Sequence, residues 1–183
     1  MLIFLAGILC AFLLFGIVIK AAVYHAEHNN THPLELKAMS LEEITDEAVL
    51  IVEAKCTGTS EAYRTSYDHE GRKAGSCAIT DYYFDIDEVY KGSAEPEELT
   101  VAINGGKLDK YTDIFPDEAK IREGQSYVLC LCRSRDELPW EQNEGDKYYI
   151  VGFNQGVFAK DKNDKLVPQN GTSTTLSELE TLL

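Results

Sequence analysis

Hydrophobic and polar positions divide the chain into an apolar start and a body in which short apolar runs alternate with polar stretches. Residues 1–19 contain no charged side chain. As an α-helix at about 1.5 Å per residue, this segment would span roughly 28 Å, close to the hydrocarbon thickness of a bilayer. We therefore expect residues 1–19 to form a transmembrane or signal-anchor helix.

The alternative for this leader is a cleaved signal peptide. Such a peptide has a basic start and a shorter apolar core, and neither is present, although Ala21 and Ala22 leave late cleavage open. Residues 20–39 mix polar side chains with helix breakers and show no sustained apolar period. The sequence thus predicts a polar linker over 20–39 and a folded domain over 40–183.

Two capping boxes predict a short helix near each end of the body. Ser40 with Glu43, and Thr175 with Glu178, have the spacing at which a hydroxyl and a carboxylate accept hydrogen bonds from amides at a helix start. Between them lie β-branched or alternating runs of strand length. The predicted strands cover residues 48–56, 81–87, 98–103, 127–132, 147–151, 156–159 and 166–167.

Residues 81–87 have the clearest strand pattern. Their apolar side chains alternate with Asp81, Asp85 and Asp87, which is typical of a half-buried antiparallel strand. We interpret the acidic side as the solvated face of an edge strand, with a calcium site as the alternative. Several short strands without βαβ alternation predict a mainly β fold, a small barrel or sandwich with short flanking helices.

Four segments, 48–52, 83–92, 99–106 and 123–129, carry a resemblance in this order. The second ends in Val-Tyr-Lys-Gly, and the last places a glycine before Tyr-Val-Leu. The body resembles the OB-fold-like domain of many bacterial cell-surface proteins and, more distantly, the netrin-like domain of the tissue inhibitors of metalloproteinases. The resemblance implies a small OB-like antiparallel barrel with a ligand-accepting face. It does not imply protease inhibition, because those inhibitors act through a mature amino-terminal cysteine.

The net charge of −14, from 17 basic and 31 acidic residues, limits the classes of function that the sequence allows. Nucleic-acid binding is disfavoured, because phosphate contacts need a basic surface. Lys20 and Lys37 follow the leader and no basic residue precedes it, which by the positive-inside rule would place the body in the cytoplasm. The leader's place at the chain start and an even number of body cysteines favour an extracytoplasmic body instead.

The body cysteines leave two interpretations open. Cys56 ends one predicted strand and Cys77 precedes the next, so a hairpin would bring them to one edge. A disulfide there would stabilise the fold by about 3 kcal/mol, but two thiols fit the same spacing. Cys130 and Cys132 lie two positions apart on one strand, which is too extended for an easy bridge, and are predicted to be core residues.

Three linker histidines, His25, His28 and His32, are spaced i, i+3 and i+7. On a helix they would share one face and could bind zinc or nickel, as in a metal-binding protein or a metal-dependent hydrolase. The asparagines and the proline among them favour a solvated linker instead, because they disrupt a helix.

No nucleophile-elbow, phosphate-loop or His-Glu-x-x-His motif occurs. We therefore predict a non-enzymatic, membrane-anchored extracytoplasmic module of the cell envelope that needs no cofactor and binds a protein, peptide or glycan. Its contact surface is expected on the barrel face and the polar loops 57–77, 107–122 and 133–147, with aromatic anchors. These anchors are Tyr63, Tyr67, Tyr111 and Trp140.

Overall fold

The computed structural model describes most of residues 29–183 and one residue of the predicted leader. The described residues are 17, 29–69, 72–93, 98–135, 147–160, 165–170 and 174–183, with backbone only for 66–76 and 98. Within these residues no helix has the length and apolar character needed to cross a membrane. The predicted leader, apart from Ile17, lies outside them.

The described chain is mainly β, which confirms the predicted class. Its helices are α2 (Leu41–Glu47) and α3 (Leu176–Thr181). Its strands are β1 (Asn29–Thr31), β2 (Leu50–Thr59), β3 (Tyr63–His69), β4 (Arg72–Lys91), β5 (Glu98–Asn104), β6 (Gly106–Leu108), β7 (Tyr111–Ile114), β8 (Ser126–Cys132), β9 (Tyr149–Ile150), β10 (Val157–Lys160), β11 (Lys165–Pro168) and β12 (Thr174–Thr175).

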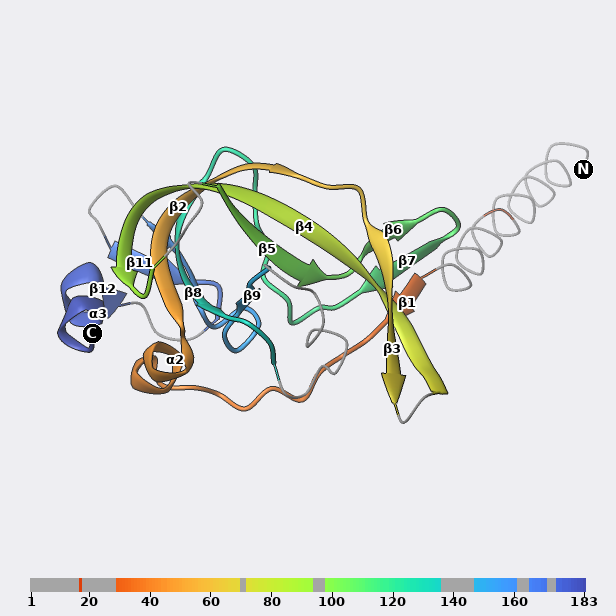
Figure 1. Cartoon of the computed structure of the whole chain (residues 1–183), viewed down its shortest axis with the longest axis horizontal. Coiled ribbons are helices and arrows are strands. Elements are labelled where there is room, and N and C mark those ends of the chain that lie inside the picture. The colour runs from red at the N-terminus through yellow and green to blue at the C-terminus, as the bar shows by residue number, and fades with distance from the viewer. Residues whose placement is uncertain are drawn as a thin grey trace, which may run out of the picture.

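The main sheet has the strand order β12-β11-β10-β8-β2-β4-β3, and β5 also pairs with β4 and β9 with β8. Figure 1 shows this sheet curving strongly, with the long strand β4 crossing the molecule. An isolated parallel bridge joins Val101 of β5 to Tyr148, just before β9, and Ala102 N donates to Tyr148 O at 2.8 Å. The described strands form no closed barrel, because this bridge does not extend into a continuous ladder.

A smaller sheet has the order β1-β7-β6, with β1 parallel to β7. β1 comes from the predicted linker, and β7 and most of β6 come from the predicted loop 107–122. Both stretches therefore contain strands where we expected irregular structure. Likewise 57–77 is not a loop but contains β3 and the start of β4. These polar strands have no alternation of apolar and polar residues, because they form by pairing with neighbouring strands and not by burying one face.

The core lies on both faces of β8. Leu129 and Leu131 pack in one apolar cluster, whereas Val128 and Cys130 pack in another, and all four are fully buried. Side chains of α2 and α3 cover the second cluster. The continuous apolar run predicts such a strand, because a strand buried on both faces needs no polar positions.

Both predicted capping boxes are present. Ser40 Oγ accepts from Glu43 N at 3.1 Å, and the Glu43 carboxylate accepts from Ser40 N at 2.8 Å. The box of Thr175 and Glu178 has the same pair of hydrogen bonds. These local contacts set the starts of α2 and α3.

The capping box of α2 predicts a pH response. The hydrogen bond from Ser40 N–H and the contact with Lys37 hold the pKa of Glu43 at about 2, below its usual 4.5. Because the folded pKa is the lower one, the carboxylate stabilises α2 above about pH 4.5, and this contribution is lost as the pH falls toward 2. In a carboxyl-detected NMR titration we expect a midpoint near pH 2 for Glu43, and a higher midpoint in Lys37→Met. A midpoint of 4.5 in the unmodified chain would contradict the capping geometry.

Candidate functional site

A groove of about 590 Å³ lies between three parts of the chain. One wall is the arm, which we define as residues 34–39, and a second wall is α2. The floor and back come from Cys132 at the end of β8, from Ser134 and Arg135 after it, and from residues 151–153 and Gln155 after β9. Figure 1 shows the arm running from β1 to α2 along one side of the molecule.

The arm is fixed at its ends and open in its middle. Leu34 N donates to Asp117 Oδ2 at 3.1 Å, and Met39 N donates to Gln155 Oε1 at 2.8 Å. In the described chain, the backbone N–H and C=O groups of Glu35 and Leu36 have no hydrogen-bond partner within the protein. The centre of this wall therefore presents unpaired donors and acceptors.

The arm departs from the prediction of a linker over 20–39. Leu34 and Leu36 are half-buried, whereas Glu35 and Lys37 between them are exposed. This alternation is typical of an extended segment with one covered face. This alternation is the sequence signal for an arm that packs on the domain. It covers only four residues, so it is hard to recognise within the polar stretch around it.

The floor of the groove is apolar and conformationally strained. Val151 and Phe153 are buried there, and Met39 is half-buried. Phe153 has φ 65, in the left-handed region that side-chain-bearing residues rarely adopt. Such strain persists only where surrounding contacts enforce it, and here the Arg135 guanidinium lies 3.9 Å from the centre of the Phe153 ring.

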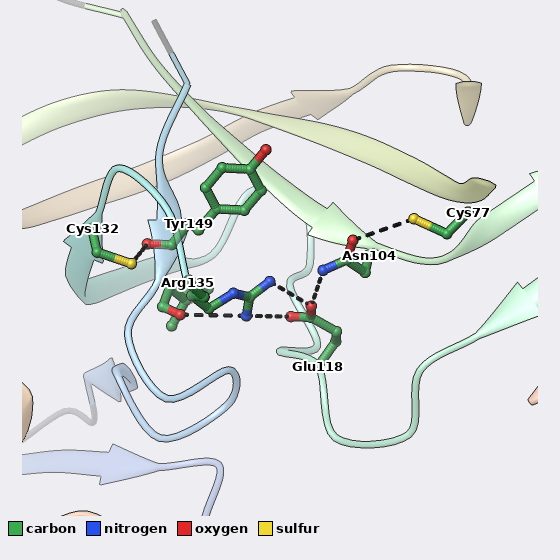
Figure 2. Close-up of polar contacts among 7 residues, drawn as sticks. Cys77, Asn104, Glu118, Cys132, Arg135 and Tyr149 are labelled. Carbon is green, nitrogen blue, oxygen red and sulfur yellow. Dashed lines mark hydrogen bonds and ion pairs between the residues drawn. The ribbon is translucent and has the colours of Figure 1, made fainter. Parts of the chain in front are cut away.

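A buried ion pair forms the back of the groove. Arg135 and Glu118 each have 4% of the side chain exposed, and Arg135 Nη2 donates to Glu118 Oε1 at 2.8 Å while Nη1 donates to Oε2 at 3.3 Å. Asn104 Nδ2 donates to the same Oε1 at 2.7 Å. Figure 2 shows this network continuing to Cys77, whose Sγ lies 3.7 Å from Asn104 Oδ1. Glu118 neutralises Arg135, so the ion pair holds the back wall of the groove in place and gives a ligand no net positive charge.

The rim of the groove is acidic. Lys37 pairs with Glu43 at 2.9 Å and also attracts Glu47 at the end of α2. Glu35 on the arm lines the groove as well, so the described rim has three carboxylates and one lysine. The C-terminal end of a helix disfavours negative charge, so Glu47 adds to a negative potential already present there.

The predicted aromatic anchors do not meet at this groove. Tyr63 is tied to Asp81 and Lys147: its hydroxyl donates to Asp81 Oδ1 at 3.0 Å and accepts from Lys147 Nζ at 2.6 Å. Tyr111 is 47% exposed on β7 and does not line the groove. The Tyr67 side chain and Trp140 lie outside the described residues.

The structure corrects the predicted acidic face of residues 81–87. Asp85 and Asp87 are exposed as expected, but Asp81 is only 8% exposed. Lys147 covers it, with Nζ 2.9 Å from Asp81 Oδ2. The lysine comes from a distant part of the chain, so the alternation within one strand could not reveal this contact.

The helical interpretation of the three histidines is wrong at His32. Residues 29–31 form strand β1, and His32 continues it with a hydrogen bond from its amide to Ile114 O. The His32 ring stacks on Phe115 at 4.7 Å, and its Nε2 is 3.7 Å from Asp113 Oδ1. His25 and His28 lie outside the described part, within which no group of three or more metal-binding side chains occurs.

The structure does not bring Cys56 and Cys77 together. Cys56 lies opposite Phe84 on β4, whereas Cys77 lies opposite Thr65 on β3. Phe84 and Cys77 are therefore roughly 23 Å apart along β4, at about 3.3 Å per residue. Both residues are thiols, which is one of the two interpretations that their spacing left open. The intervening hairpin of β3 and β4, which was predicted as a loop, is what separates them.

The remaining cysteines differ in their predicted reactivity. Cys132 is half-buried and lines the groove, whereas Cys130 is fully buried and burial raises its pKa to about 12. Because the thiolate is the reactive form, we expect N-ethylmaleimide to modify Cys132 more than about tenfold faster than Cys130 in the native protein. Mass spectrometry of peptic fragments measures both rates, with Cys132→Ser as the control. Equal rates would show that the groove is closed to solvent.

Sequence reasoning missed the residues that build the groove. Glu118 and Arg135 come from two stretches that were predicted to be loops, and no pattern within either one indicates burial. Phe153 follows a glycine and stands near the end of a predicted strand, which is a signal for a turn but not for its strained geometry. Only the alternation in the arm could have been found.

Comparison with known proteins adds no assignment. A scan against protein-family models and a search of curated proteins both found no match to this chain. The functional conclusion therefore rests on the groove itself.

Proposed function

We propose that the chain is a non-enzymatic binding module that holds an extended peptide in the groove between the arm, α2 and the turn after β9. One observation carries the proposal: Glu35 and Leu36, whose backbone groups have no hydrogen-bond partner within the described protein, line a groove with an apolar floor. Extended peptides bind by pairing with such backbone groups and placing alternate side chains in pockets. We favour a peptide over a glycan, because a peptide backbone carries amide donors and carbonyl acceptors at the same spacing as an extended arm.

The chemistry of the groove supports binding rather than catalysis. Its described lining contains no histidine, and Arg135 is held by Glu118. The Cys132 Sγ lies 3.5 Å from the Tyr149 carbonyl oxygen, a contact that does not activate a thiol.

We further propose that residues 1–19 tether the module to a membrane and that the domain faces outward, as part of the cell envelope. The uncharged length of the leader supports the tether. We also propose an OB-like arrangement for the domain. The support is the parallel bridge of Val101 and Tyr148, which brings β5 beside β9 within the curved sheet.

A groove-filling substitution tests the proposal. Ser134 is half-buried in the groove lining, so Ser134→Trp should fill the site. Ser177→Trp, on the exposed side of α3, is the matched control. Random peptides displayed on phage would be selected against the full chain in phosphatidylcholine nanodiscs.

We expect the selected peptides to bind the unmodified chain and Ser177→Trp equally and to lose binding to Ser134→Trp. Thermal unfolding of both variants shows whether each retains its fold. Selected peptides that bind Ser134→Trp as well as the unmodified chain would place recognition elsewhere and refute the proposed function.

A further inference from the structure

The proposed peptide groove has a charge preference. Building on that function, we infer that its ligand is a cationic peptide segment in which lysine or arginine side chains alternate with apolar ones. The inference adds to the proposed function a chemical class of ligand, and it rests on the charges of the rim and the geometry of the arm.

Every cation in the described groove lining is already neutralised. Lys37 is held by Glu43, and Arg135 is held by Glu118. Lys37 also attracts Glu47, so this lysine is shared between two carboxylates, while Glu35 stands on the opposite wall. A ligand in the groove therefore meets an excess of negative charge, which favours cations and repels acidic peptides.

The alternation follows from the arm. A peptide that pairs with Glu35 and Leu36 must be extended, and successive side chains of an extended chain point to opposite faces. One set would lie over the apolar floor, where the half-buried Met39 offers the most accessible apolar surface and Val151 and Phe153 lie beneath. The other set would point toward the rim, where Glu35 and Glu47 lie.

The charge of the whole molecule acts in the same direction. A net charge of −14 attracts cationic segments over distances longer than a single contact and raises their association rate at low ionic strength. Zwitterionic membranes do not compete for such a peptide, so binding can be measured with the full chain in phosphatidylcholine nanodiscs.

The test uses a fluorescein-labelled heptapeptide, Lys-Leu-Lys-Leu-Lys-Leu-Lys, with blocked ends, and fluorescence anisotropy as the readout. The double variant Glu35→Gln with Glu47→Gln removes one negative charge from each wall of the groove. The matched control is Glu42→Gln, an exposed carboxylate of α2 outside the groove lining. A second peptide with glutamate in place of every lysine tests the sign of the charge.

We expect saturable binding to the unmodified chain and to Glu42→Gln, and about tenfold weaker binding to the double variant, since each exposed ion pair contributes modestly. The acidic peptide should not bind. Equal affinity of the double variant, binding of the acidic peptide, or no binding of the basic one would each overturn the inference. The phage selection with Ser134→Trp gives an independent result, so peptides that need the groove but are not basic would leave the proposed function standing.

Discussion

Replacing Glu118 with alanine is expected to lower the free energy of unfolding by about 3–5 kcal/mol, because the change leaves a buried charge without its partner. Glu118 and Arg135 each have only 4% of the side chain exposed, so water cannot substitute for the missing carboxylate. The same carboxylate also accepts from Asn104, so the substitution affects two donors at once.

Urea unfolding followed by circular dichroism measures this loss. Glu123→Ala is the matched control, since Glu123 is an exposed carboxylate nearby in sequence and should change stability by less than about 0.5 kcal/mol. The double variant Glu118→Met with Arg135→Met removes both charges and should be more stable than Glu118→Ala. If Glu118→Ala unfolded at the same urea concentration as the control, the ion pair would not support the back of the groove.

Replacing Asp113 with alanine is expected to cost about 2–4 kcal/mol, since hydrogen bonds to a buried carboxylate are among the stronger ones. Asp113 is 5% exposed and joins the two sheets. Its Oδ2 accepts from Ala78 N of β4 at 2.8 Å, and its Oδ1 accepts from Asn30 Nδ2 of β1 at 2.9 Å. The substitution would leave the buried Ala78 amide without this acceptor and would loosen β1.

Besides the loss of global stability, Asp113→Ala should change the chain locally, around β1. Hydrogen–deuterium exchange should show faster exchange over residues 29–34 in Asp113→Ala, whereas the β8 amides should change only as far as global stability falls. Asp85→Ala, an exposed carboxylate of β4, serves as the control. Because β1 leads into the arm, Asp113→Ala should also weaken peptide binding in the groove. Unchanged exchange over residues 29–34 would mean that Asp113 does not hold the arm.

The features that were predicted correctly depend on short stretches of sequence. The capping box of Ser40 and Glu43 needs only two residues three positions apart. The continuous apolar run of β8 is enough to predict that this strand is buried on both faces. The mainly β class follows from many such runs. These signals are local, so one sequence is enough to read them.

The groove could not be predicted in the same way, because its parts meet only through tertiary contacts. Glu118 pairs with Arg135, which lies in a different loop segment. Asp81 is covered by Lys147, which is also distant from it in sequence. The separation of Cys56 and Cys77 depends on a polar hairpin whose strands carry no apolar alternation. In each case the partner, rather than the residue's own neighbours, determines burial.

We propose that the arm binds an extended peptide through its unpaired backbone. Hydrogen–deuterium exchange of the full chain, with and without the Lys-Leu heptapeptide, measures this pairing at the arm itself. The amides of Glu35 and Leu36 have no partner within the described protein, so they should exchange fast alone and slow down when the peptide binds. If residues 34–39 exchange equally fast with and without saturating peptide, the peptide does not pair with the arm.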